Sequence, residues 1–183
     1  LYNDMDQGTR DIIKAGLLKK GLDEGKKAYT DPLYPYSWWK NSAFNWNQVC
    51  NSGLLIGAIA VAEEDTAVAS VIISNAIKNL PYAIKSYGPD GASGEGPGYR
   101  DYATSYTAYG LSALEVALGN TFGLTAIQGL SETGNFPMYA AGPTGYFLNY
   151  ADAGEKSKLG APVASMWLAS AFQNDAFSDF IED

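Results

Sequence analysis

The sequence predicts an all-α protein, because helical periodicity runs through most of the chain and sustained period-two alternation is missing. A helix that is apolar on every side is followed by amphipathic ones, a pattern that favours two concentric layers of paired helices. We therefore expect an α/α toroid, or an arc of one, with little or no sheet. At 183 residues, the chain is expected to form a single helical domain over 1–183.

The first predicted element is an amphipathic helix over residues 4–29, where apolar residues recur at helical spacing between lysines and acids. We expect a break in it near Gly21. The next segment, 30–40, contains two prolines and many aromatic residues. Since proline interrupts a regular helix, this segment is predicted to be an ordered, aromatic-lined connection.

The middle of the chain predicts a pair of helices of different character. Residues 47–64 are small or apolar on every side, which is typical of a helix that is covered all round. Residues 66–87 are amphipathic, and Pro81 is expected to kink this helix. The predicted buried side of the second helix consists of Val68, Val71, Ile72, Ala76, Leu80, Ala83 and Ile84.

The remaining helices follow a glycine-rich segment. A helix over 100–118 is predicted to end by capping at Gly119. One of its stripes is predicted to hold Tyr102, Tyr106, Tyr109 and Leu114. Shorter helices are expected over 123–133, 162–172 and 175–182, with proline in the first turn of the second.

Composition excludes several classes of function. Twelve basic and 20 acidic residues give a net charge of −8, and nucleic acid is not an expected partner because no cluster of Lys and Arg is present. The sequence contains no histidine and a single cysteine, Cys50, so a catalytic triad, a His-ligated metal site and an internal disulfide are all excluded. We expect neither a metal nor a cofactor.

Nothing in the sequence points to a membrane. Residues 1–10 lack the basic and apolar pattern of a signal peptide. The most apolar stretch, 53–62, is too short to cross a bilayer and is followed by three acids, so membrane insertion is not expected.

Two polar segments that precede helices are candidates for chemistry. The first, 41–51, holds four asparagines and Gln48, more amides than the capping of one helix requires. Capping and core hydrogen bonding remain an equally weighted explanation for these amides. The second, 87–102, holds five glycines, which predict turns or a close approach of backbone to a ligand at Gly96 and Gly98.

These segments resemble a known family. The run 45–51 with its Gly/Ala-rich helix, the motif from Asp90 to Tyr99 with its aromatic helix, and the segment 147–154 are together similar to the helical toroid of heparinase II/III-like polysaccharide lyases. The likeness spans roughly 38–168. It implies β-elimination on uronic-acid polysaccharides in the periplasm or outside the cell.

The resemblance also implies roles for matched residues. Asn45 would neutralise the uronate carboxylate, and Tyr99, which follows the motif that begins at Glu95, would act as base, acid or both; Tyr102 is the alternative tyrosine. Gln48 is a second amide donor, suited to the negative charge that develops on the carboxylate. Arg100 is the nearest cation in sequence, although successive helical residues point apart.

The chain departs from this family in two respects. Family members are several times longer and add a β-sandwich domain that usually brings a histidine to the cleft, whereas this chain has 183 residues and no histidine. The resemblance therefore implies either part of a larger lyase, an α/α toroid followed by a C-terminal β-sandwich domain, or a pared-down relative of such enzymes. The net charge of −8 favours a less charged uronate polymer over a heavily sulfated one, with Lys40 and Arg100 as the local cations.

Aromatic residues supply candidate platforms for sugar rings. Trp38 and Trp39 are weighed equally between sugar binding and core packing, whereas Trp46, beside a predicted buried helix, is weighed more toward the core.

Two other function classes remain open. An inverting glycoside hydrolase on an α/α barrel would use Glu95 with Asp90 or Asp101, with the two carboxylates roughly 6.5–9.5 Å apart. A noncatalytic glycan-binding helical domain is the second.

Overall fold

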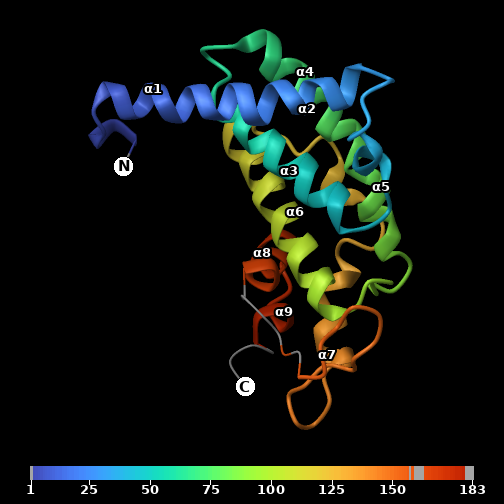
Figure 1. Cartoon of the computed structure of the whole chain (residues 1–183). Coiled ribbons are helices and arrows are strands. Elements are labelled where there is room, and N and C mark those ends of the chain that lie inside the picture. Colours follow the sequence, from blue (N-terminus) through green and yellow to red (C-terminus); the bar gives the residue numbers. More distant parts are fainter. Residues whose placement is uncertain (1, 157, 159–162, 180–183) are drawn as a thin grey trace.

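The computed structural model of the chain describes residues 2–156, 158 and 163–179, and helices dominate it (Figure 1). The α-helices are α1 (Gln7–Gly16), α2 (Asp23–Thr30), α3 (Asn45–Ala60), α4 (Thr66–Asn79), α5 (Pro81–Ile84), α6 (Pro97–Leu118), α7 (Phe136–Ala140), α8 (Val163–Phe172) and α9 (Ala176–Asp179). Shorter helical segments are η1 (Tyr2–Asp4), η2 (Leu17–Leu22), η3 (Trp38–Asn41), η4 (Lys85–Tyr87), η5 (Leu124–Ala126) and η6 (Glu132–Gly134). Within the described ranges there is no β-strand, only an isolated bridge between Ala141 and Phe147. The expected all-α class is confirmed for these residues.

Helix α3 lies at the centre of the molecule. It packs against α4 and α6, and η2 contacts it as well. Together α1, η2 and α2 form one long helix that crosses an end of this bundle, with α1 projecting beyond it (Figure 1). Helix α8 packs against α6, and α9 packs against α8.

The expected break near Gly21 is a change of helical pitch rather than an interruption. Gly21 lies in η2, a π-helical segment that joins α1 and α2. The backbone N–H of Asp23 donates to the carbonyl of Leu18, five residues earlier. Such π segments insert an extra residue per turn into an otherwise α-helical chain.

The predicted aromatic connection after α2 is ordered. The hydroxyl of Tyr34 donates to a carboxylate oxygen of Glu24 at 2.6 Å, and the rings of Tyr34 and Tyr36 meet edge to face. This contact and η3 hold the connection against α2.

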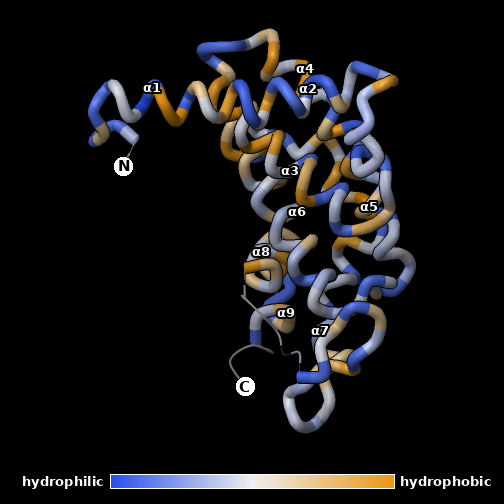
Figure 2. The backbone as a smooth tube through the Cα atoms, viewed as in Figure 1, coloured by the Kyte–Doolittle hydropathy of each residue, from blue (hydrophilic) through white to orange (hydrophobic). Residues whose placement is uncertain are grey.

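The hydrophobic core has two parts that meet at α4. Figure 2 shows hydrophobic positions concentrated in the helices of the body. The larger part joins α3, α4, α6 and α8 through buried residues that include Leu55, Leu80, Leu111, Leu114 and Leu168. The smaller part joins η2, α3 and α4 through Leu22, Ala58, Val61, Val68, Ala69 and Ile72.

The expectation that the helix over 47–64 is covered all round is wrong. Four residues along one side of α3 are exposed, namely Trp46, Gly53, Ile56 and Ala60. No described helix lies over this side. The composition of α3 is apolar without a strong direction, so the sequence did not reveal which side would stay open.

The helix over 66–87 is divided at Pro81, as expected. Helix α4 ends at Asn79, and Pro81 is the first residue of α5, where its missing N–H costs no hydrogen bond. Six of the seven residues predicted on the buried side are buried, and Val71 is half-buried. By length and hydropathy the stretch Thr66–Tyr87 also meets the criterion for a membrane span, which core helices of soluble proteins meet too.

Helix α6 begins earlier than predicted and ends where predicted. Pro97 is in its first turn, and Gly119 takes the left-handed conformation (φ 63°) and donates to the carbonyl of Glu115. Leu114 is fully buried, whereas Tyr102 and Tyr109 are 45% exposed. The prediction of one shared stripe is therefore wrong for Leu114, which lies on the core side.

The last third of the chain departs most from prediction. The helix expected over 123–133 is replaced by η5 and η6, which Gly129 separates at a φ of 97°. Helix α7 was not predicted. Helices α8 and α9 match the expected helices over 162–172 and 175–182, of which Pro162 and residues 180–182 lie outside the described residues.

Candidate functional site

The carboxylate of Glu95 caps the first turn of α3. One of its oxygens accepts the backbone N–H of Asn45 at 2.6 Å, and the other accepts the Nδ2 of Asn45 at 2.5 Å. Phe44, at the N-cap position, makes no side-chain capping bond. Glu95, fifty residues further along the chain, thus caps α3 in place of an N-cap side chain. Its negative charge lies at the helix end that the macrodipole makes positive.

The other amides of the polar run hold the core together. Asn47 donates its Nδ2 to the carbonyls of Lys40 at 2.7 Å and Asn79 at 3.1 Å. The Oδ1 of Asn51 accepts the hydroxyl of Tyr29 at 2.6 Å. These contacts favour the core hydrogen-bonding explanation for Asn47 and Asn51 and set Asn45 apart from them.

Gln48 lies in a buried hydrogen-bond network. Its Nε2 donates to the hydroxyl of Tyr87 at 2.9 Å and to Oγ1 of Thr107 at 3.1 Å. The Tyr87 hydroxyl also lies 2.9 Å from Oγ1 of Thr104. With 2% of its surface exposed, Gln48 joins α3, η4 and α6 and does not face a ligand. We call Gln48, Tyr87, Thr104 and Thr107 the core network.

The glycine-rich loop 88–96 is fixed by contacts with the rest of the chain. Gly91 has a φ of 85°, and a Cβ there would come within 2.3 Å of the backbone of Glu132. Gly96 has a φ of 93° and lies against the backbone of Tyr150. The hydroxyl of Tyr150 donates to the carbonyl of Ser93 at 2.6 Å. The missing side chains of Gly91 and Gly96 therefore allow a close approach to the protein's own backbone.

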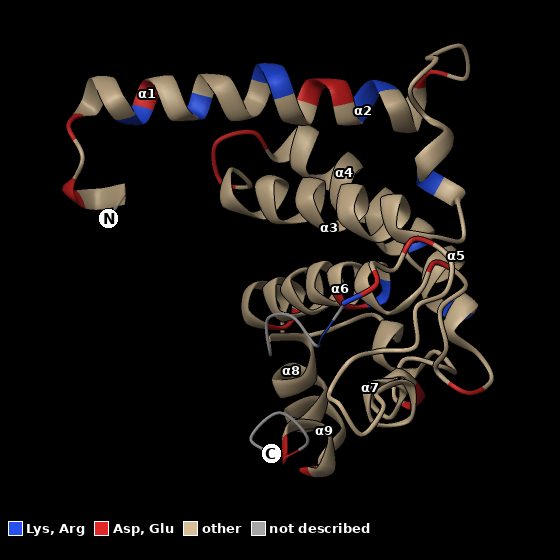
Figure 3. Cartoon of the chain, turned by 60° about the horizontal axis from the view of Figure 1, so that its bottom comes forward, with Lys and Arg blue, Asp and Glu red and all other residues tan. Residues whose placement is uncertain are grey.

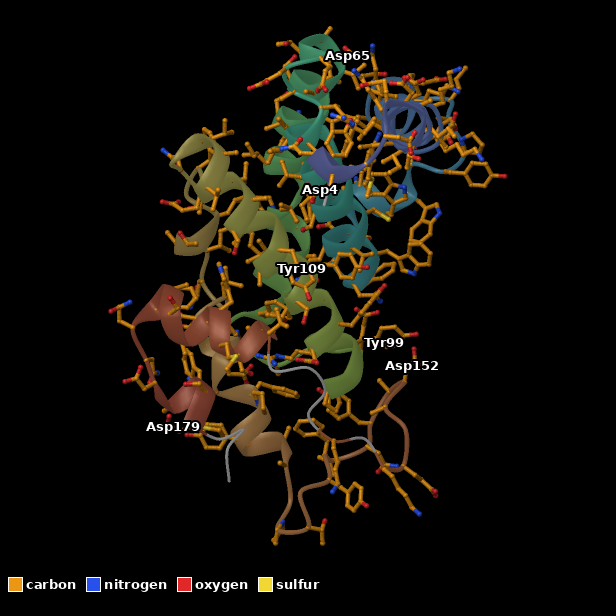
Figure 4. All side chains as sticks on the ribbon, turned by 90° about the vertical axis from the view of Figure 1, so that its left-hand side faces the viewer. Asp4, Asp65, Tyr99, Tyr109, Asp152 and Asp179 are labelled. Carbon is orange, nitrogen blue, oxygen red and sulfur yellow. The ribbon has the colours of Figure 1, made fainter. Side chains whose placement is uncertain are left out.

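Tyr99 and Tyr102 are exposed at the start of α6. They are 39% and 45% exposed, and together with Gly98 and Asp152 they line an open depression of about 490 Å³. In Figure 4 both Tyr99 and Asp152 lie at the lower end of α6, with Tyr109 further along the same helix. A hydrogen bond with Tyr106 raises the pKa of Tyr102, which keeps the Tyr102 hydroxyl protonated at neutral pH.

Arg100 points into the core, away from Tyr99. It is 1% exposed, and its Nε donates to Oγ1 of Thr133 at 3.0 Å while Nη2 donates to the carbonyl of Thr133. The guanidinium lies 5.9 Å from the centre of the Phe136 ring. Burial lowers the pKa of Arg100, and burial likewise raises the pKa of the neighbouring Asp101. Arg100 therefore anchors the start of α6 to η6 and does not contact a ligand in this arrangement.

Three aromatic residues form an exposed cluster on either side of Asn45. Trp38 and Trp46 are each 50% exposed, with ring centres 5.4 Å apart, and Phe44 stacks on Trp38 at 6.0 Å. Trp39 is 8% exposed and packs edge to face on Tyr29, so it belongs to the core. We call Trp38, Phe44 and Trp46 the aromatic platform. Phe44 was not among the predicted site residues, and its position next to Asn45 is the one sequence signal that could have indicated it.

Charge is distributed unevenly over the molecule. Lysines gather along α1, η2 and α2, whereas α3 carries no charged residue and α4 has only Lys78 (Figure 3). The end of the body that carries Glu95 is mainly acidic, with Asp90, Glu132 and Asp152 close to the loop. No group of three or more potential metal ligands occurs among the residues that the structure describes.

Comparison with known proteins does not assign a function. No protein-family model matches the chain, and no curated protein matches it. Function is therefore inferred from the residues themselves. Asn45 and Glu95 are in direct contact, Phe44 and Trp46 of the aromatic platform are the chain neighbours of Asn45, and Tyr99 follows Glu95 by four residues in the sequence.

Proposed function

We propose that the chain is part of the α/α toroid of a polysaccharide lyase that cleaves a uronic-acid polymer by β-elimination. The observation that carries this proposal is the bidentate contact between Asn45 and the carboxylate of Glu95. Asn45 offers two N–H donors that fit a carboxylate, and these lie at the positive end of the sixteen-residue helix α3. In the proposed complex, a uronate carboxylate takes the place that the carboxylate of Glu95 has beside Asn45.

The proposed reaction uses this arrangement in a simple way. A base removes the proton on the carbon next to the uronate carboxylate, and negative charge develops on the carboxylate oxygens. The N–H groups of Asn45 stabilise that charge. The electron pair then forms a carbon–carbon double bond as the glycosidic oxygen leaves from the neighbouring carbon and takes up a proton.

Tyr99 is the proposed base and acid. It is exposed at the start of α6 beside an open depression, and the resemblance to heparinase II/III-like lyases assigns a tyrosine to this position of the motif. Tyr102 is the alternative tyrosine, because it lies one turn beyond the motif position and its hydroxyl is hydrogen-bonded to Tyr106. The sequence contains no histidine, so among the residues of this chain Tyr99 is the candidate that the resemblance supports.

The aromatic platform is the proposed binding surface for a sugar ring. Trp46 follows Asn45 in the chain and packs with Trp38, and both tryptophans keep half of their surface open, which suits stacking against the apolar face of a pyranose. The acidic surroundings disfavour a densely sulfated polymer, so the substrate class is a uronate polymer of low charge density.

The test is incubation of the chain with unsulfated uronate polymers while the ultraviolet absorbance of the unsaturated product is followed. Tyr99→Phe should abolish the absorbance change, and Tyr102→Phe, as the matched control, should leave most of it. Glu95→Gln keeps an acceptor for Asn45 but removes the competing charge, so the Michaelis constant is expected to fall.

Three outcomes would count against the proposal. New reducing ends without unsaturation would indicate the glycosidase that uses Glu95 with Asp90 or Asp101. Polymer binding without turnover, unaffected by Tyr99→Phe, would indicate a glycan-binding domain. No binding and no turnover with any uronate polymer would refute the role of Asn45 as a carboxylate receptor.

A further inference from the structure

A second cavity lies between the loop 88–96 and α7. Its volume is about 510 Å³, within the range of roughly 300–1,000 Å³ that small-molecule sites occupy. Its walls include Asp90 from the loop, Glu132 from η6, Asn135, and the rings of Phe136, Tyr139 and Tyr150. It shares no lining residue with the depression at Tyr99. We call it the α7 cavity.

Two carboxylates line the α7 cavity, and each uses only one of its oxygens in the hydrogen bonds of the described residues. Glu132 accepts the N–H of Gly129 at 2.9 Å and the hydroxyl of Ser131 at 2.7 Å through the same oxygen, Oε2. These bonds lower the pKa of Glu132, so it is ionised at neutral pH. Asp90 uses only Oδ1, to accept the N–H of Ala92 at 3.2 Å. The second oxygen of each carboxylate has no partner among the residues that the structure describes.

No cation in the lining balances these two charges. The nearest basic group with a described contact to the wall is Arg100, which lies behind Phe136 and donates to Thr133. Arg100 is 1% exposed and lies in the core, so it does not enter the cavity. It can offset at most one of the two negative charges. The lining therefore holds two carboxylates and no basic side chain.

Apart from Asn135, the rest of the lining is apolar or aromatic. Tyr139 and Leu148 are 86% and 70% exposed and line the cavity where it opens to solvent. The hydroxyl of Tyr150 is engaged with Ser93, and burial together with Asp90 raises the pKa of Tyr150, so this group stays neutral. Aromatic faces beside carboxylates are the surroundings in which an organic cation is bound best.

We propose that the α7 cavity binds an organic ammonium ion, a ligand whose charged nitrogen meets Asp90 and Glu132 and whose carbon body lies against Tyr139 and Leu148. The free carboxylate oxygens accept the N–H groups, and the tyrosine ring faces the charge. An anion is repelled by the same pair. This site is independent of the proposed lyase chemistry, since none of its residues has a role in that reaction.

The test compares three probes that share a ring and differ in charge: benzylammonium, benzyl alcohol and benzoate. Each is titrated into the full chain while amide chemical shifts are followed by NMR. We expect saturable shifts in residues 90–92 and 132–140 with benzylammonium, binding at least tenfold weaker with benzyl alcohol, and none with benzoate.

The variant Asp90→Asn/Glu132→Gln isolates the two charges. Both amides keep an oxygen that can accept the existing N–H and hydroxyl bonds, so the loop and η6 retain their contacts. Benzylammonium binding should fall at least tenfold. The matched control, Glu63→Gln/Asp175→Asn, changes the net charge equally at exposed positions outside the cavity lining and should bind as the original chain does.

The proposal is overturned by any of three results. These are equal binding of benzyl alcohol, equal loss of binding in the control variant, or shifts that map outside the α7 cavity. Because the readout is ligand binding without a polymer substrate, failure here is distinguishable from failure of the proposed lyase activity.

Discussion

Replacing Glu95 with alanine removes both acceptors from the first turn of α3. The backbone N–H and the Nδ2 of Asn45 lose bonds of 2.6 and 2.5 Å to a charged group. A hydrogen bond to a charged group contributes about 1.5–3 kcal/mol, and loss of an N-cap costs about 0.5–2 kcal/mol. These two energies describe the same contact and are therefore not added. Glu95 is half-buried, so water replaces part of the lost hydrogen bonding. We expect a loss of about 2–3 kcal/mol.

The assay is urea unfolding followed by tryptophan fluorescence, with a thermal melt by circular dichroism. For a chain of this size the expected loss corresponds to a fall of roughly 4–12 °C in Tm. Asn45→Ala removes only the side-chain bond and should cost about 1 kcal/mol. The double variant should lose less than the sum of the two, because they share one contact.

Glu63→Ala is the matched control, since Glu63 is an exposed acid in the turn after α3. Its effect should lie within about 0.5 kcal/mol of zero. If Glu95→Ala were as mild as this control, or if Asn45→Ala and Glu95→Ala were additive, the contact would not hold the start of α3. The argument that this helix end is a carboxylate receptor would then fail.

Three further substitutions or reactions test the surrounding structure. Tyr87→Phe should cost about 1–2 kcal/mol in urea unfolding because Gln48 loses a buried acceptor, and a cost near zero would contradict the core network. Gly91→Ala should cost about 3 kcal/mol because its Cβ meets backbone at a φ of 85°, whereas Gly94→Ala, where a Cβ meets nothing, should be nearly neutral in the same assay. Burial raises the pKa of Cys50 to about 11, so its alkylation rate should rise about tenfold per pH unit between pH 8 and 10, and a plateau near pH 9 would refute this.

Much of the helical framework could be predicted from local sequence. Pro81 divides α4 from α5 and Gly119 ends α6 because these residues act through their own backbone, without reference to distant parts of the chain. Helix α7 escaped prediction because it is five residues long and contains Pro137. The open side of α3 escaped as well, since its exposure depends on which helices pack nearby.

The candidate site shows the same division. Asn45, Glu95 and Tyr99 were singled out by their motifs, but the contact between Asn45 and Glu95 joins residues fifty positions apart. The hydrophobic periodicity of a sequence does not predict a contact between residues so far apart. The burial of Arg100 was equally hidden, because its partner Thr133 lies in a segment where the sequence predicted a helix instead of two short turns.

The core network has a consequence for the alignment of α3 with α6. The amide of Gln48 meets Thr107 at one level along the two helix axes, and a slide of α6 by one turn would displace its partner by about 5.4 Å. Gln48 and Tyr87 would then keep only their bond to each other and would lose their buried partners Thr107 and Thr104, which disfavours other registers. The core network thus fixes the register of α3 against α6. It keeps the first turns of both helices, with Asn45 on one and Tyr99 on the other, at a constant offset.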